Sequence, residues 1–375
     1  MGSSSTDLLD VDALFAPPGL ARGVAVAKSE GAPQISPITE PIQPTRISRR
    51  QLLRRCFGVG AFAAASGVYG REIEPFWVDW HDVPMPIRNL PKSFEGFRIT
   101  QLTDLHTGDE VPMSYLHDVV NKVKQAKPDL VVVTGDLVNH SLDAVGPMCD
   151  LLAELPARAS IPVIASLGNH DYDISSVYAG NSGIPTRIAD AIEARLRNLN
   201  VTLLRNRAIS LNHSDGRLWF AGLEDLWSGR FCPQIAFAGL DVNEPIIALS
   251  HNPDTAIELD SFGAQWTLAG HTHGGQVRIP GFGALIVNVQ NQEFQQGYFK
   301  LPHGNLYVSR GVGYLKQVRV FCRPEVPRQE IGLLRQFDLG SARSCADFRV
   351  AFAVASSFAK RAGHVLCGSI LNRTA

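Results

Sequence analysis

The segment DLVVVTGD, residues Asp129–Asp136, indicates the class of fold that the sequence encodes. It is a continuous run of mostly β-branched residues that stops at Gly-Asp, as expected of a strand buried on both faces of a sheet. A helix is predicted just before it, over Ser114–Lys127, and Pro128 ends that helix. A buried strand that follows a helix in this way is typical of an α/β protein. The helix is predicted from apolar residues at helical spacing: Leu116, Val119, Val120 and Val123.

Strands and helices alternate on both sides of this segment. A strand is predicted over Phe97–Thr103, a helix over Ala144–Leu155, a strand over Ile161–Leu167 and a further helix around Ile188–Leu196. Beyond Val201 strands dominate, in the stretches VTLLRN, RLWFAGL, PIIALSH, QWTLAGH and NLYVSRG, with turn residues between them. The predicted fold class is therefore α/β, with two packed mixed β-sheets flanked by helices.

Length, composition and charge restrict the function only broadly. The 375 residues are 45% hydrophobic and 19% charged, which suits one large globular domain or two small ones. A net charge of −1 gives no electrostatic reason to expect nucleic-acid binding, so no nucleic-acid partner is predicted. The six cysteines contain no C-x-x-C pair, which excludes the usual thiolate zinc and redox motifs and leaves one or two disulfides open.

The N-terminal region differs from the rest of the chain. Residues 1–45 are rich in Ser, Pro and Gly and are predicted to form a disordered leader. Residues 46–70, RISRRQLLRRCFGVGAFAAASGVYG, place five arginines before a modest apolar run, which is the layout of an export signal. Because Arg49–Arg50 resembles the twin-arginine type, we expect export by the twin-arginine machinery to a periplasmic or membrane-associated location. A weak anchor and a buried Ala/Gly-rich helix are the alternatives.

The C-terminal region, residues 339–375, is a basic tail with five Lys or Arg residues and one acid. Phe348, Phe352, Ala355 and Ala359 have the spacing of one helical face. A basic amphipathic helix on a membrane surface and a poorly ordered tail therefore both remain open.

Polar residues with metal-binding side chains occur where the predicted strands end. The ends of strands in an α/β sheet gather at one edge, which is where ligand sites form. Carboxylate and amide oxygens together with imidazoles, without cysteine, suit Mn²⁺, Fe or Zn²⁺. So many groups exceed the needs of one tetrahedral ion and favour two ions that share a bridging carboxylate. These residues are Asp104, His106, Asp136, Asn169, His170, Asp171, His251, His271 and His273.

Capping and turn roles explain each of these residues when it is taken alone, whereas the whole set favours a site. Three other polar residues lack so clear a position at a strand end. Asp225 and Asn139 are interpreted as solvated loop residues, and His140 is interpreted as a surface or packing residue.

Five short motifs follow one another in order, each after a predicted strand: D-x-H at Asp104, G-D at Gly135, G-N-H-D at Gly168, a single His251, and G-H-x-H at Gly270. This order resembles the calcineurin-like metallophosphoesterase family over roughly residues 72–337. The resemblance implies a four-layer sandwich domain with a binuclear metal centre. The contexts SHNPD and GHTHGGQVRIPG are similar to a twin-arginine-exported branch related to enzymes that cleave the pyrophosphate of UDP-diacylglucosamine.

The resemblance also implies a role for each matching residue. One metal would be held by Asp104, His106, Asp136 and His273, and the second by Asp136 as a bridge with Asn169, His251 and His271. His170 would stand by the phosphate as proton donor or transition-state stabiliser. Asp171 would hold the His170 imidazole by a hydrogen bond.

The function predicted from these residues is a metal-dependent phosphodiesterase or pyrophosphatase whose substrate is a small-molecule or lipid phosphoester. Two divalent metal ions, Mn, Fe or Zn, are the expected cofactors. The alternatives are a soluble nucleotidase or phosphomonoesterase, a nuclease, and a non-catalytic metal-stabilised binding protein.

Overall fold

A computed structural model describes residues 48–175, 186–284 and 286–333. The predicted leader, the predicted basic tail and the predicted domain end at Phe337 lie outside these residues. The chain divides into two compact units between Cys56 and Phe57, and the description below concerns the second unit. Helix α1 (Arg49–Val68) covers the predicted signal segment. Among the residues described, no helix combines the length and hydropathy that crossing a bilayer requires.

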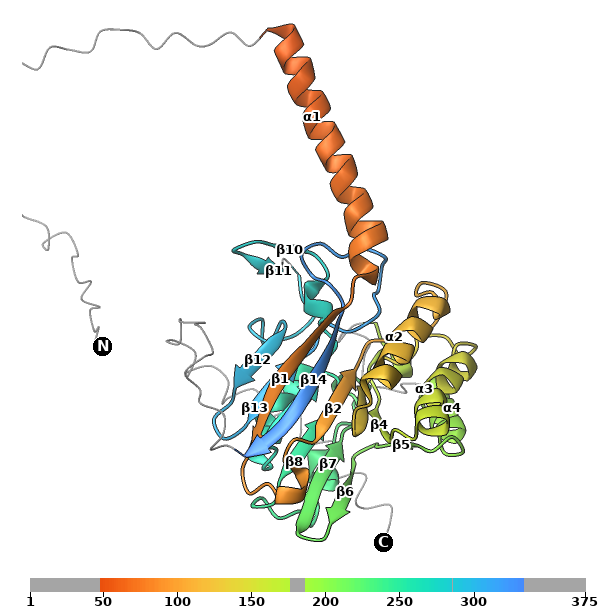
Figure 1. Cartoon of the computed structure of the whole chain (residues 1–375), viewed down its shortest axis with the longest axis vertical. Coiled ribbons are helices and arrows are strands. Elements are labelled where there is room, and N and C mark those ends of the chain that lie inside the picture. The colour runs from red at the N-terminus through yellow and green to blue at the C-terminus, as the bar shows by residue number, and fades with distance from the viewer. Residues whose placement is uncertain (1–47, 176–185, 285, 334–375) are drawn as a thin grey trace, which may run out of the picture. The chain divides into compact units, whose positions relative to one another are not determined.

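The first sheet carries most of the predicted strand–helix alternation. Its strands β2, β3, β4 and β5 are parallel, β14 is antiparallel to β2, and β1 is parallel to β14 at the edge. The last strand of the domain thus lies between β1 and β2 (Figure 1). In spatial order the strands are β1 (Asp79–Ile87), β14 (Glu325–Leu333), β2 (Arg98–Leu102), β3 (Leu130–Thr134), β4 (Val163–Ser166) and β5 (Val201–Leu203).

The second sheet is built from the strand-rich half of the chain. Strands β13, β9, β8 and β7 are parallel, and the two outer strands are antiparallel to their neighbours. A separate two-stranded hairpin follows β9. The strands of the second sheet are β12 (Gly297–Lys300), β13 (Asn305–Val308), β9 (Trp266–Ala269), β8 (Ile246–Leu249), β7 (Gly216–Gly222) and β6 (Arg207–His213), and those of the hairpin are β10 (Arg278–Ile279) and β11 (Gly283–Ala284).

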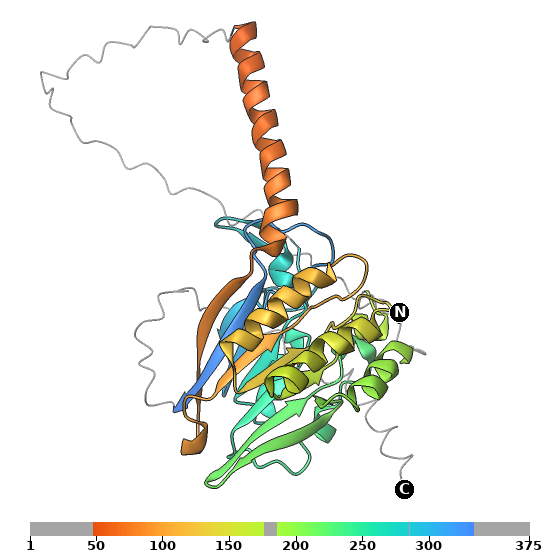
Figure 2. The same cartoon turned by 45° about the vertical axis from the view of Figure 1, so that its right-hand side comes forward.

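The two sheets pack face to face, with helices on both outer faces. In β3, Val131 and Val133 pack into the core beneath the helices, whereas Leu130 and Val132 pack into the core between the sheets. This alternation explains why β3 is apolar throughout, and it confirms the predicted fold class. Figure 2 shows helices lying across the first sheet. The helices are α2 (Met113–Ala126), α3 (Val145–Ala159) and α4 (Arg187–Leu196) on the first sheet, with α5 (Pro233–Ala236) and α6 (Ala256–Ser261) packed against the second.

Strand β1 was missed in the sequence because it contains Pro84 and Pro86. Proline lacks the N–H that an interior strand donates, so prolines argue against a strand unless it lies at an edge. Here β1 is the edge strand, and only β14 pairs with it among the described strands. β14, β6 and β12 were also absent from the predicted strands.

Short helices connect the main elements, and the first two of them attach the start of the domain to a late loop. The carbonyl of Gly70 accepts from the Arg319 N–H at 2.8 Å, and the buried Glu74 carboxylate accepts from the Cys322 N–H at 2.5 Å. The segment after α1 is therefore part of the folded domain. The short helices are η2 (Tyr69–Ile73), η3 (Glu74–Phe76), η4 (Lys92–Phe94), η5 (His170–Tyr172), η6 (Leu226–Ser228), η7 (Pro253–Thr255) and η8 (His273–Gly275).

Candidate metal centre

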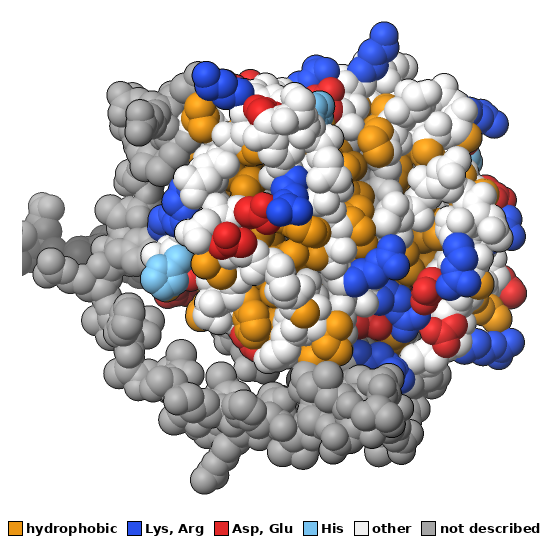
Figure 3. Space-filling view, turned by 90° about the horizontal axis from the view of Figure 1, so that it is seen from below, with side chains coloured by type: hydrophobic (Ala, Val, Ile, Leu, Met, Phe, Trp, Pro, Cys, Tyr) orange, Lys and Arg blue, Asp and Glu red, His pale blue; other side chains and the backbone are white. Residues whose placement is uncertain are grey.

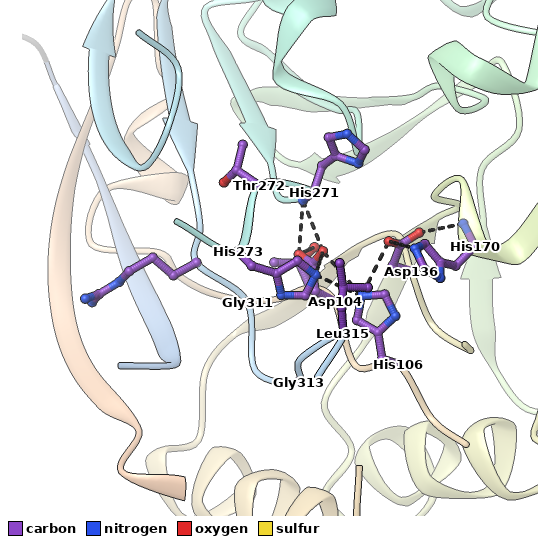
Figure 4. A network of polar contacts seen from close by, with 12 residues as sticks. Asp104, His106, Asp136, His170, His271, Thr272, His273, Gly311, Gly313 and Leu315 are labelled. Atoms are coloured by element: carbon purple, nitrogen blue, oxygen red, sulfur yellow. Dashed lines mark hydrogen bonds and ion pairs between the residues drawn. The ribbon is translucent and has the colours of Figure 1, made fainter. Parts of the chain in front are cut away.

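The loops after β2, β3, β4, β8 and β9 all reach one place at the edge of the two sheets. They bring together the nine residues predicted from the sequence, every one of which is buried. Figure 4 shows Asp104, His106, Asp136, His170, His271 and His273 among them. Strand ends meet there because β2, β3 and β4 are parallel, as are β8 and β9. Burying carboxylates and imidazoles away from water costs free energy unless an opposite charge or a hydrogen bond offsets it, so a buried cluster of this kind indicates a functional site.

The first group of potential metal ligands consists of Asp104, His106 and His273, whose ligand atoms all lie within 4.8 Å of one another. His106 Nε2 lies 3.0 Å from His273 Nε2, and His273 Nε2 lies 3.3 Å from Asp104 Oδ1. The carboxylate of Asp104 also accepts hydrogen bonds from the His271 N–H. This group matches three of the four residues that the family resemblance gives to one metal.

The second group consists of Asp136, His251 and His271. His251 Nε2 lies 3.1 Å from Asp136 Oδ2, and His271 Nδ1 lies 2.9 Å from Asn169 Oδ1. The opposite ring nitrogens are already engaged, since His251 Nδ1 contacts the Thr134 carbonyl and His271 Nε2 contacts the Asn288 carbonyl. A neutral ring that donates to a carbonyl presents its other nitrogen as a lone pair.

Asp136 lies between the two groups. Its Oδ2 is 3.5 Å from His106 Nε2 on one side and 3.1 Å from His251 Nε2 on the other. Its Oδ1 accepts from the His170 N–H at 2.9 Å, which fixes the carboxylate. The position is the one that a carboxylate shared by two ions requires.

Five of these candidate ligands have an uncommon backbone conformation. Non-glycine residues seldom adopt positive φ, and such strain tends to collect at functional sites. Asp and His are enriched in that region among non-glycine residues, but sequence reasoning did not anticipate the strain at these positions. Positive φ values occur at Asp104 (53°), His106 (47°), Asp136 (50°), His271 (72°) and His273 (50°).

Burial dominates the electrostatics of the centre. It raises the pKa of Asp104 to about 7, and it lowers the pKa of His271 to about 3. Burial also works against a charged His251 ring, yet the Asp136 carboxylate raises the pKa of that ring to about 10. Burial opposes ionisation of Asp136 as well, but the surrounding imidazoles, His251 foremost, hold its pKa well below the usual range. The Asp136 carboxylate therefore strongly favours positive charge beside it, at the position of the His251 ring.

His170 lies at the rim of this cluster and has partners that the sequence did not predict. Its Nδ1 is 3.0 Å from Asn139 Oδ1, and its ring packs 3.9 Å from the His140 ring, measured between centroids. The interpretation of Asn139 as a solvated loop residue was wrong, whereas the half-buried His140 is a packing residue, as predicted, and packs on the His170 ring. Asn139 lies three residues after Asp136, on the same loop, and that spacing was the only available signal.

The role predicted for Asp171 needs a correction. Its carboxylate accepts from the N–H groups of Leu137 at 3.0 Å, Val138 at 3.1 Å and Gly168 at 2.9 Å. No contact with the His170 imidazole is found among the described residues. Asp171 therefore links the loop after β3 to the loop after β4. Its carboxylate binds backbone N–H groups rather than the His170 imidazole, because the strand ends hold those N–H groups in place.

Asp225 is a further member of the cluster that the sequence interpretation missed. It was interpreted as a solvated loop residue, yet it is buried, and its Oδ1 accepts from the Trp227 N–H at 2.8 Å. Its Oδ2 has no hydrogen-bond partner among the described residues, and burial, with Asp136 nearby, raises its pKa to about 7. The ring of Trp227 packs edge-on against His271 with centroids 4.5 Å apart. Asp225 follows β7 just as the other acids follow their strands.

A loop before β14 closes over Asp104. Gly313 N–H donates to the Asp104 carbonyl at 2.7 Å, and a Cβ on Gly311 would lie 2.6 Å from Asp104 Cβ. The fully buried Arg319 fixes this loop, because its guanidinium donates to the carbonyls of Gly313 at 2.6 Å and Arg310 at 2.9 Å. The loop thus holds one carboxylate ligand from the side opposite the sheet.

Comparison with known proteins agrees with this geometry. A family model described as calcineurin-like phosphoesterase matches residues 97–275. The chain is 28% identical over 289 residues to the uncharacterized metallophosphoesterase YkuE of Bacillus subtilis (strain 168), covering 75% of this chain and 96% of YkuE. It is 32% identical over 299 residues to the UDP-2,3-diacylglucosamine pyrophosphatase LpxG of Chlamydia trachomatis, covering 66% of this chain and 86% of LpxG.

A third relative matches this chain over almost the whole of its own length. The phosphodiesterase YaeI of Escherichia coli (strain K12) is 30% identical over 290 residues, covering 76% of this chain and 99% of YaeI. The resemblance predicted from five short motifs is thereby confirmed. The chain belongs to the calcineurin-like phosphoesterase family and is a hydrolase of phosphoric ester bonds.

Proposed function

We propose that this protein hydrolyses a phosphodiester or pyrophosphate bond with two divalent metal ions held at the candidate metal centre. One ion would be bound by Asp104, His106, Asp136 and His273. The other would be bound by Asp136, Asn169, His251 and His271. Mn²⁺, Fe and Zn²⁺ all suit this set of oxygen and imidazole ligands.

One observation carries the proposal: electron-rich atoms face each other at hydrogen-bond distance in the second group. The His271 Nδ1 lone pair faces Asn169 Oδ1 at 2.9 Å, because His271 Nε2 is engaged by a carbonyl. Two acceptors repel unless a cation lies between them, so the residues fit a metal ion.

Bound divalent ions supply Lewis-acid activation of water and of the phosphoryl oxygens. The protein contributes His170, whose Nε2 lies 3.9 Å from Asp136 Oδ2 and so borders both groups. Burial lowers the pKa of His170 to about 4, so the ring is neutral at pH 7. In a neutral ring, Nδ1–H donates to Asn139 Oδ1, so Nε2 presents a lone pair to the centre. Once Nε2 takes up a proton, His170 would stabilise the charge developing on a phosphoryl or leaving oxygen.

The relatives and the leader guide the choice of substrate and location. LpxG is a UDP-2,3-diacylglucosamine pyrophosphatase and YaeI a phosphodiesterase, so a lipid-linked phosphoester or pyrophosphate is the substrate class that we propose. The arginine-rich segment around Arg49–Arg50 supports export by the twin-arginine machinery to an extracytoplasmic, membrane-associated location.

The test is metal analysis of the purified protein combined with a panel of phosphate esters. We expect about two ions per chain and hydrolysis of bis-p-nitrophenyl phosphate and of a lipid-linked pyrophosphate in the presence of Mn²⁺. His170→Ala should keep its metal and lose most of kcat, while His303→Ala, on the surface loop between β12 and β13, should behave like the wild type. A loaded wild-type protein that cleaves neither compound would refute the proposal, and cleavage of phosphomonoesters alone would instead favour a nucleotidase.

A further inference from the structure

Large apolar side chains lie exposed on two neighbouring segments beside the metal centre. Phe282 is 86% exposed and Ile286 is 82% exposed, both in or just after the β10–β11 hairpin, and Phe321, in the loop before β14, is 67% exposed. Exposure of this degree at contiguous apolar side chains marks a contact surface. The hairpin patch is defined as the side chains of Ile279, Phe282, Ile286, Leu315 and Phe321.

The two segments form one surface because they are hydrogen-bonded to each other. The N–H of Arg278 donates to the Val320 carbonyl at 2.9 Å, and the N–H of Val320 donates to the Gln276 carbonyl at 2.9 Å. The side chain of Gln276 also donates to the Val318 carbonyl at 2.8 Å. The hairpin and the loop that carry the exposed side chains are therefore held side by side.

The hairpin is fixed directly to the loop that carries the metal-centre histidines. Arg278 donates to the Gly274 carbonyl at 2.9 Å, one residue after His273. At the other end, the Asn288 carbonyl contacts His271 Nε2 at 3.0 Å. The patch thus borders the centre, and whatever covers the patch is brought next to the phosphoester site.

The surroundings of the patch have the chemistry of a membrane interface. Lys316 and Arg71 border it, with side chains 78% and 69% exposed and paired with Glu110 and Glu72, and the Gln317 amide donates to the Arg71 carbonyl. The half-exposed Trp77 carries the Arg323 guanidinium 4.6 Å from its ring centroid. Aromatic rings paired with cations suit the zone where acyl chains meet anionic headgroups. On the lower face of the domain, by contrast, hydrophobic side chains are interleaved with many charged ones (Figure 3).

The path of the chain also favours a lipid surface over a second copy of the protein. The arginine-rich, apolar N-terminal segment ends at Tyr69–Gly70, and Gly70 is hydrogen-bonded to Arg319 in the same loop as Phe321. The β10–β11 hairpin projects beyond the two sheets (Figure 1). A segment with the composition of an export signal or weak anchor therefore enters the domain at the edge of the patch.

We infer that the hairpin patch docks the domain on an anionic lipid surface, so that the metal centre meets phosphoesters borne by that surface. The inference rests on the proposed function for its substrate, but the docking itself does not require hydrolysis. Phe282 and Ile286 enter the acyl-chain boundary, while Lys316 and Arg71 contact lipid phosphates.

The test is flotation of the 375-residue chain with phosphatidylcholine–phosphatidylglycerol vesicles. Each large apolar side chain removed should weaken partition roughly tenfold, so Phe282→Ser with Ile286→Ser should lower it by about two orders of magnitude. Val242→Ser is the matched control, because Val242 is 59% exposed on the loop before β8 and outside the patch. All variants keep the leader and the tail, so any difference reports the patch.

Three further readouts separate the outcomes. Phe282→Trp should gain a blue-shifted emission component that brominated acyl chains quench. Cleavage of soluble bis-p-nitrophenyl phosphate should be unchanged in the double variant, so loss of docking is distinguishable from failure of the proposed function. Flotation that is equal in the wild type and the double variant overturns the inference. A wild-type dimer that becomes a monomer in the double variant also overturns the inference, since the patch would then bind a second copy of the protein.

Discussion

Two glycines next to the metal centre allow the carboxylates to be displaced one at a time. A Cβ on Gly168 would lie closer to the Asp136 carboxylate than real Cβ atoms approach, and 2.8 Å from His251 Cδ2. A Cβ on Gly270 would overlap the Thr103 hydroxyl and the Asp104 carboxylate instead and would lie 2.9 Å from Thr103 Cγ2. Neither glycine has positive φ, so an alanine there tests space alone.

The expected size of the effect follows from the contact distances. Relief of either overlap requires the carboxylate to move by roughly 1 Å, together with the Asp136 backbone N in the first case and the Thr103 hydroxyl in the second. Metal ligands tolerate only about 0.2 Å, so Gly168→Ala should weaken binding of both ions and Gly270→Ala that of one, by roughly 10–100-fold. Overpacking should also lower the free energy of unfolding by about 1–3 kcal/mol.

Metal titration by calorimetry and urea unfolding measure these two effects. The control is Gly108→Ala, in the same loop as His106, because its Cβ would meet Asn139 Cβ at an ordinary 3.6 Å. Two ions bound by Gly168→Ala with wild-type affinity would show that Asp136 does not bridge them. Equal loss in Gly168→Ala and Gly270→Ala would refute the division of ligands between two sites.

The remaining predictions concern the proton chemistry and the metal. Asn139→Asp should raise the pKa of His170, since a carboxylate favours the imidazolium, and should shift the pH profile of kcat upward; an unshifted profile would exclude Asn139 as its partner. In folded, EDTA-treated protein the pKa of Asp225 is about 7, whereas in the unfolded chain it is the ordinary aspartate pKa of 3.8. The protonated group therefore stabilises the folded state at low pH. That stability is lost as pH rises from 3.8 through about 7. Asp225→Asn should therefore gain stability relative to the wild type as pH rises from about 4 to about 7 in urea unfolding, and a pH-independent difference would contradict this. EDTA should lower Tm, because an ion at one hundred times its Kd contributes about 2.7 kcal/mol; an unchanged Tm would mean that the centre binds no metal in the folded state.

The sequence predicted those parts of the fold that repeat a simple pattern. β3 and α2 have strict apolar patterns, and the structure has both within a few residues of the predicted bounds. β1 was not predicted, because its prolines are acceptable only at an edge, and edge position is a property of the whole sheet. The five motifs likewise indicated which side chains meet, since parallel strand ends must gather.

The supporting contacts were less predictable than the candidate ligands. Whether Asp171 contacts an imidazole or backbone N–H groups depends on fractions of an ångström between two loops, and no spacing in the sequence encodes that. Asn139 and Asp225 looked like ordinary loop residues, because the His170 contact of Asn139 and the burial of Asp225 depend on neighbouring elements. Positive φ at five of the predicted ligands was equally invisible, since only packing reveals where the backbone is strained.

The position of β14 between β1 and β2 has a consequence for the order of synthesis. β1 ends at Ile87 and is finished early on the ribosome, whereas its pairing partner in the described sheet begins at Glu325. One edge of β2 also stays unpaired until β14 is made, and the loop over Asp104 directly precedes β14. The first sheet therefore stays open until β14 has emerged, and the loop over Asp104 is made shortly before β14, the last of the described strands.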